Sequence, residues 1–293
     1  MGSTTVAQDK QWYEIRDLFL GDNYHARNIP LAIQMAKTCM HPDAQWLYSV
    51  FKDNADVLYD CDAAAILNSR LENGDIDVQT LCFFGYLKDP MYSEEISQAA
   101  TRGYAFAQAV KASRRNRDNI CLELAKQSAL QGEREGFYLL ARCYRFLSIN
   151  IHQIAEYFKL AADLNDCKAM SEYAYFLDDP KEAWKLWCKC YQVGCSSDFE
   201  ENVDEIVTNE RFPRDEDRSI IFMIGKVLSE RRRFNYSNQS YVKASAFYHA
   251  QIENYKEAVH TFSLCGLRLG LYKDVRVLIG KTIWNGRKEA AYL

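Results

Sequence analysis

The sequence predicts an all-α protein, an α–α superhelix (solenoid) of stacked antiparallel helix pairs. Two observations support this prediction. Chain breakers are rare, with five Pro and 13 Gly among 293 residues, which favours helices joined by short turns over a strand-rich fold. A short phrase also recurs at an interval of roughly 30 residues, the size of one helix–turn–helix unit.

The recurring phrase is an amphipathic run that closes on a small pair, followed by Gly or Asn and a new helix. It is clearest in QAATRGYAFAQA from Gln98, QSALQGEREGFYLLA from Gln127 and KLAADLNDCKAMSEYA from Lys159. The stop residues, spaced 29, 29, 33 and 29 residues apart, are Gly74, Gly103, Gly132, Asn165 and Gly194. Each is expected to end a helix in the left-handed conformation, which Gly and Asn adopt most readily.

The helix after each stop repeats a small residue that would let two helix backbones approach closely. The equivalent positions hold Ala44, Val78, Ala107, Gly136 and Ala169. Phe83 breaks the small-residue pattern a few positions later, so packing is hardest to predict there. The alternative is an ordinary helical bundle, but a bundle has no reason to keep the period. One helix pair cannot bury its apolar stripe alone, so neighbouring pairs are expected to stack.

The period suggests four segments. Residues 1–11 are predicted to be an N-terminal tail, and residues 12–195 the repeat array, whose first helix is Trp12–Leu20. The period fails in the acidic stretch 196–218, which is predicted to be a connector. Residues 219–293 are predicted to form helices that continue or cap the array.

The second helix of each unit carries a recognisable pattern. Ile154–Asn165 reads IAEYFKLAADLN and Glu182–Gly194 reads EAWKLWCKCYQVG. This pattern resembles the Sel1-like repeat, a relative of the tetratricopeptide repeat, over about residues 30 to 195. The resemblance implies a helical superhelix and adaptor activity that brings other proteins together.

Two further segments resemble repeat proteins of large amoeba-infecting viruses. They are the Cys-x-His-Pro-x-Ala-x-Trp phrase of Cys39–Trp46 and the ending SLCGLRLGLYKDVRVLIGKTIW from Ser263. This resemblance implies no biochemical activity.

The sequence gives no sign of catalysis. It contains no phosphate-binding loop, nucleophile elbow or kinase signature. No two of the five histidines stand at the one-turn spacing of a helical metal site. We therefore expect no enzyme activity, no cofactor and no bound metal.

The cysteines and apolar runs bear on the compartment. Most of the ten cysteines stand among apolar neighbours, where free Cys behaves as a small hydrophobe. Free thiols, with no signal peptide at the N-terminus, predict a reducing cytoplasmic setting, in the host cell if the protein is viral. No apolar run approaches the ~20 residues of a membrane span, so no membrane association is expected.

The charge balance argues against a dedicated nucleic-acid binder, since the net charge is −4 and the pI about 5.8. Two basic clusters could still bind phosphate: Arg114, Arg115 and Arg117, and Arg231 to Arg233. The alternative is that they are solvated cations at helix C-termini, where the helix dipole favours them.

The first helix of each pair would line an inner surface of the superhelix. Aromatic and Arg side chains dominate interface hot spots, and the candidate partner-binding residues on this face are Trp46, Phe84, Tyr138, Arg142, Arg145 and Tyr175. The alternative is that the aromatics pack between units. The leading hypothesis is a non-enzymatic scaffold that binds other proteins or peptides. The alternatives are a self-associating structural component of a larger complex and, less favoured, a nucleic-acid binder using the Arg clusters.

Overall fold

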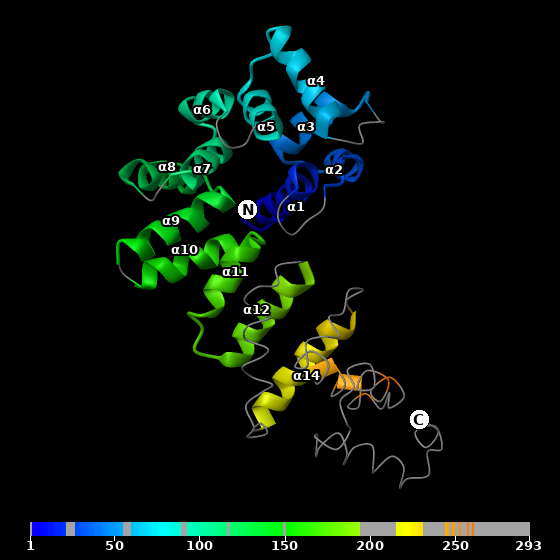
Figure 1. Cartoon of the computed structure of the whole chain (residues 1–293), viewed down its shortest axis with the longest axis vertical. Coiled ribbons are helices and arrows are strands. Elements are labelled where there is room, and N and C mark those ends of the chain that lie inside the picture. The colour runs from blue at the N-terminus through cyan, green and yellow to red at the C-terminus, as the bar shows by residue number, and fades with distance from the viewer. Residues whose placement is uncertain are drawn as a thin grey trace. The chain divides into compact units, whose positions relative to one another are not determined.

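The computed structural model describes residues 2–21, 27–54, 60–88, 93–115, 118–148, 151–193 and 215–230, with a few positions between 244 and 260. Every regular element within these ranges is a helix, in agreement with the predicted all-α class (Figure 1). The chain divides into two units, Met1–Phe176 and Leu177–Leu293. None of the described helices is long and apolar enough to cross a membrane.

The first unit holds the helices that carry the predicted repeats. They are α1 (Gly2–Leu20), α2 (Ile29–Ala36), α3 (Pro42–Phe51), α4 (Asp60–Glu72), α5 (Val78–Lys88), α6 (Glu94–Thr101), α7 (Ala105–Ser113), α8 (Asn119–Leu130), α9 (Arg134–Phe146), α10 (Ile151–Asp163) and α11 (Cys167–Ala174). From α4 to α11 each helix packs against the next one along the chain, and α7 also packs on α9. This next-neighbour packing is what stacked helix pairs require.

Four of the predicted stop residues lie directly after a helix in the left-handed conformation. Their φ angles are +89° at Gly74, +89° at Gly103, +83° at Gly132 and +65° at Asn165. At each one, the stop residue's N–H donates to the carbonyl three residues back and the next N–H donates to the carbonyl five back, with N···O distances of 2.9–3.3 Å. This double bond pattern is the Schellman motif, which satisfies the last carbonyls of a helix. Gly194 lies outside the described residues.

The small residues at the start of each following helix sit where helices meet. Ala44, Ala107, Gly136 and Ala169 are buried, and Val78 is half-buried. At Gly136 the approach is close, because a Cβ there would come 2.6 Å from the backbone nitrogen of Ala129 on α8. Only a residue without a side chain allows α8 and α9 to pack at this distance.

The described part of the second unit contains α12 (Pro180–Val193) and α14 (Asp215–Glu230), which pack on each other. In α12 the rings of Trp184 and Trp187 meet edge to face, with centroids 5.1 Å apart. On α14, Gly225 lies against the backbone of Ala244, whose oxygen would be 2.1 Å from an added Cβ.

Two predicted boundaries differ from the structure. Residues 1–11 were expected to be a tail, but α1 begins at Gly2 and runs through them as one helix. The predicted array of residues 12–195 spans the point after Phe176 at which the chain divides into two units. Helix α14 begins at Asp215, inside the stretch expected to be a connector; the first part of that stretch lies outside the described residues.

Candidate functional site

Helix α1 packs across the first helices of several successive pairs. The rings of Trp12 and Phe19 meet Phe83 of α5, with centroids 6.2 and 5.9 Å apart. The Arg16 guanidinium lies 4.0 Å from the ring centroid of Phe106 on α7. Helix α1 also contacts α3, and its polar side chains reach the start of α9. The side of these helices that carries Phe83 and Phe106 is therefore closed by the chain itself.

Phe83 explains why the small-residue pattern fails in the second unit. Its ring is fully buried and also contacts Trp46, with centroids 5.2 Å apart, and Phe106, at 6.2 Å. A small residue at this position would leave the space between α5 and α1 empty. The large residue is required because an additional helix packs there.

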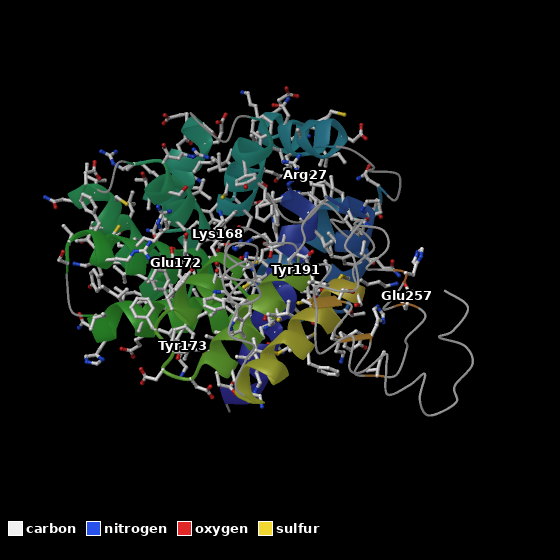
Figure 2. All side chains as sticks on the ribbon, turned by 60° about the horizontal axis from the view of Figure 1, so that its bottom comes forward. Arg27, Lys168, Glu172, Tyr173, Tyr191 and Glu257 are labelled. Carbon is white, nitrogen blue, oxygen red and sulfur yellow. The ribbon has the colours of Figure 1, made fainter. Side chains whose placement is uncertain are left out.

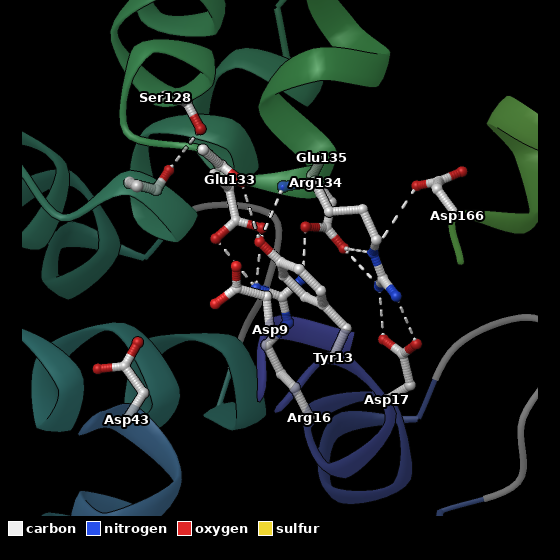
Figure 3. A network of polar contacts seen from close by, with 12 residues as sticks. Asp9, Tyr13, Arg16, Asp17, Asp43, Ser128, Glu133, Arg134, Glu135 and Asp166 are labelled. Carbon is white, nitrogen blue, oxygen red and sulfur yellow. Dashed lines mark hydrogen bonds and ion pairs between the residues drawn. The ribbon is translucent and has the colours of Figure 1, made fainter. Parts of the chain in front are cut away.

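A buried polar network joins α1 to the turn between α8 and α9 (Figure 3). Arg16 is 1% exposed, and its Nη1 donates to both carboxyl oxygens of Glu133, at 3.0 and 3.2 Å. Its Nη2 donates to Glu135. The Tyr13 hydroxyl donates to the Gly132 carbonyl at 3.2 Å and accepts from the Arg134 N–H at 3.1 Å. Every contact crosses more than 100 residues of sequence, so the network fixes where α1 lies.

A second guanidinium completes the network. Nη1 and Nη2 of Arg134 donate to the two carboxylate oxygens of Asp17, at 2.8 and 2.7 Å. The same side chain donates to Glu135, and its Nε lies 4.0 Å from a carboxylate oxygen of Asp166 at the start of α11. Asp166 in turn accepts from the Ala169 N–H and caps α11. Arg134 thus links α1, α9 and α11.

The network contains more carboxyl groups than guanidinium groups, and their pKa values reflect this. The pKa of Glu133 is raised to about 8, mainly by burial; the attraction of Arg16 lowers it and the neighbouring Glu135 charge raises it. Glu135 is also desolvated, but Arg134 and Arg16 hold its pKa well below the ordinary value. The Arg16–Glu133 contact has ion-pair geometry, yet the pKa places the proton of the two carboxyl groups on Glu133. We therefore assign the negative charge to Glu135 and a neutral, hydrogen-bonded form to Glu133 at neutral pH.

Burial also raises the pKa of Asp166 to about 6, partly offset by Arg134. Two guanidinium groups cannot neutralise four ionised carboxylates in a dry interior, so the least well compensated carboxyl groups keep a proton. The charged groups of this network pair with one another, which indicates that the network holds α1 in place. The network does not form a surface open to a partner.

Two of the six predicted partner-binding residues belong to this closed region. Phe84 is 6% exposed and packs in the core, and Trp46 is half-buried against Phe83. The prediction that Phe84 presents a partner-binding ring is therefore wrong for this structure, because the residue is packed within the core that α1 completes. The alternative, that these aromatics pack between units, describes both residues.

Tyr138, Arg142 and Arg145 lie together on α9, one turn apart in succession. The Arg142 guanidinium lies 5.6 Å from the Tyr138 ring centroid, and burial raises the Tyr138 pKa to about 12. Arg145 donates from both terminal nitrogens to Glu172 of α11 and lies over the ring of Phe158. Glu172 is labelled in Figure 2. Arg142 has no carboxylate partner among the described residues.

Tyr175 extends this group at the end of α11. It follows Glu172 by three residues, a spacing that places two side chains on one helix face, and it is 55% exposed. We call Tyr138, Arg142, Arg145, Glu172 and Tyr175 the α9–α11 surface. It combines aromatic rings, a charge held in place and a guanidinium that is available for a further contact.

The first Arg cluster is partly paired, and one cysteine differs from the prediction. Arg115 forms a bidentate pair with Asp118, which neutralises part of the first cluster; Arg117 and the whole second cluster lie outside the described residues. Seven cysteines are free thiols: Cys39, Cys61, Cys82, Cys121, Cys143, Cys188 and Cys190. The expectation of a free thiol is wrong at Cys167, which is disulfide-bonded. Cys195 and Cys265 lie outside the described residues.

Sequence reasoning missed the network residues Tyr13, Arg16, Glu133 and Arg134. The available signals were Arg16 within the apolar run WYEIRDLFL and the large Phe83 at a position expected to be small. Comparison with protein-family models and with curated proteins finds no match to this chain, so the likeness to Sel1-like repeats rests on the repeated phrases alone.

Proposed function

We propose that the helix pairs of the first unit form a Sel1/tetratricopeptide-like superhelix and that the chain is a non-enzymatic scaffold for other proteins or peptides. The packing of successive helices and the repeated Schellman stops support the superhelix. The α9–α11 surface supports the scaffold, and it is the part of the predicted binding face that α1 does not close.

The observation that carries the proposal is the Tyr138–Arg142 pair beside the Arg145–Glu172 ion pair. A half-buried ring under a guanidinium is already partly desolvated and held in one orientation, so these two side chains lose little entropy when a partner binds there. Arg145 is held by Glu172, whereas Arg142 can donate hydrogen bonds to a partner's carboxylate or carbonyl groups. This favours a peptide segment with an acidic group next to an apolar side chain.

Affinity purification with mass spectrometry tests the proposal. Full-length protein carrying Arg142→Gln together with Tyr138→Phe is compared with the wild type. The expected result is the loss of specific partners from the variant, since charge and hydroxyl are removed while the ring that packs on Phe158 is kept.

A matched variant, Arg102→Gln with Tyr157→Phe, changes the same residue types on α10 and just after α6 and should retain the partners. The proposal fails if both variants retain every specific partner of the wild type. It also fails if both lose them equally, because the α9–α11 surface would then have no special role.

A further inference from the structure

Two free thiols face each other between α8 and α9. Cys121, in the first turn of α8, and Cys143, in the last turn of α9, have sulfur atoms 3.5 Å apart. They are 22 residues apart in sequence and lie in the same apolar cluster. The bonded distance in a disulfide is about 2.0 Å, so a relative movement of roughly 1.5 Å would join them.

The burial of the pair limits which reagents can reach it. Cys121 is 3% exposed and Cys143 is 4% exposed. A bulky disulfide reagent has no access to such sulfur atoms without unfolding, whereas hydrogen peroxide is about the size of a water molecule. Residues just before Cys121 are open to solvent, Ile120 being 51% exposed, so the path from solvent to the first sulfur is short.

We propose that Cys121 and Cys143 form a reversible oxidation site that takes a small peroxide as its oxidant. The thiolate sulfur of one cysteine attacks a peroxide oxygen, which breaks the O–O bond and gives a sulfenic acid and one water. The second thiol then attacks the sulfenic sulfur, forms the S–S bond and expels the hydroxyl as a second water. Two thiols and one hydrogen peroxide thus yield one disulfide and two waters, and a dithiol reductant reverses the change.

The bond would tie together the two helices whose connecting turn holds α1. That turn carries Glu133 and Arg134, the partners of Arg16 and Asp17. Closing a loop of this length restricts the unfolded chain, so oxidation is expected to raise the Tm of the first unit by several degrees. The oxidation chemistry does not require a partner bound at the α9–α11 surface.

Peptide mapping of the full-length protein after hydrogen peroxide treatment tests this proposal. Remaining thiols are alkylated under denaturing conditions, and the protein is digested without reductant. The expected product is a cross-linked peptide pair that contains Cys121 and Cys143, lacks two hydrogen atoms and disappears on reduction. Cys121→Ser and Cys143→Ser should each abolish it, while Cys61→Ser, at an exposed free thiol, should not.

Cys61 also serves as the internal control in the wild type, because its oxidation shows that peroxide was active. Recovery of Cys121 and Cys143 as alkylated thiols in a sample where Cys61 is oxidised would overturn the proposal. So would a Cys121 or Cys143 cross-link to any other cysteine in place of this pair. The wild-type map decides the outcome even if a serine variant does not fold.

Discussion

Arg134, the first residue of α9, forms two parallel hydrogen bonds with Asp17 of α1, 117 residues earlier in the chain. The guanidinium is 6% exposed and the carboxylate 19% exposed, so both charges are largely withdrawn from water. Such a pair is stable only when each partner is held in place. It identifies α1 as an integral part of the first unit.

Removing one side of this pair should destabilise the protein strongly. Asp17→Ala leaves the buried Arg134 charge less well compensated, and we expect a loss of about 2–4 kcal/mol in the free energy of unfolding. A double-mutant cycle of Asp17→Ala with Arg134→Ala, followed by urea unfolding, should give a coupling energy above about 1 kcal/mol.

The exposed pair of Arg115 and Asp118 provides the control, and its cycle should show little coupling because solvent screens both charges. If the losses in the free energy of unfolding caused by Asp17→Ala and Arg134→Ala were additive, the two hydrogen bonds between Asp17 and Arg134 would not form.

The stability should fall as the pH rises from about 5 to 8. Glu133 has a folded pKa raised to about 8 from an ordinary 4.5, so the folded state binds more protons than the unfolded state between these values. The contribution of protonated Glu133 to the free energy of unfolding is complete below pH 4.5 and is lost as the pH rises through 8. Its size is about 1.4 kcal/mol for each unit by which the folded and unfolded pKa values differ. Asp166 acts in the same direction, but only up to its pKa of about 6.

Glu133→Gln keeps an acceptor and donors but cannot ionise, so its free energy of unfolding should be nearly independent of pH between 6 and 8. Asp118→Asn, at an exposed carboxylate whose pKa is lowered by Arg115, should keep the wild-type slope. Equal slopes for wild type and Glu133→Gln would contradict the assignment of the proton to Glu133.

Gly136→Ala should destabilise the contact between α8 and α9. Alanine favours the helical state by about 1 kcal/mol over glycine, so an exposed helix would gain stability. Here the new Cβ would lie 2.5 Å from the Ser128 Oγ and 2.6 Å from the Ala129 nitrogen, and overpacking of this kind costs about 1–3 kcal/mol. Thermal unfolding should show a lower Tm, and a raised Tm would contradict the close approach.

Gly103→Ala tests whether the stop residues need the left-handed backbone conformation, with no effect of overpacking. An added Cβ would meet no atom within 4 Å, but φ is +89°. The expected loss is about 1–2 kcal/mol from the left-handed conformation alone, and Gly103→Asn should lose less because Asn tolerates that region. Urea unfolding of both variants measures the difference; equal stability of Gly103→Ala and wild type would show that the helix does not end there in this way.

The helix pairs could be predicted from sequence because their determinants are local. At a residue such as Gly103 or Asn165 the helix ends because the N–H of that residue bonds to the carbonyl three back, and the N–H of the next residue bonds to the carbonyl five back from itself. A buried small residue such as Ala107 or Gly136 marks a close approach to an adjacent helix. Both features recur with the period, so they are visible in the sequence before any contact is known.

The position of α1 could not be predicted because the residues it contacts are distant in sequence. Its polar side chains are also of types that are common on solvent-exposed helices. Arg16 looks like a surface charge in an amphipathic helix until Glu133 and Phe106 are placed beside it. For the predicted binding face, the sequence indicated which residues share a repeat position but not which of them are exposed. Tyr138 and Arg142 remain partly exposed, whereas Phe84, at an equivalent repeat position, is buried in the core.

Hydrogen exchange of the α1 amides, measured by mass spectrometry on the full-length protein, tests most directly whether this helix is built into the first unit. The account predicts that amides of residues 12–20 exchange as slowly as those of α7 and α9, and that Asp17→Ala speeds the exchange of α1 more than that of α7. Exchange of α1 within seconds in the wild type, while α7 and α9 stay protected, would show that the helix is not packed there and would reopen the face that carries Phe83 to a partner.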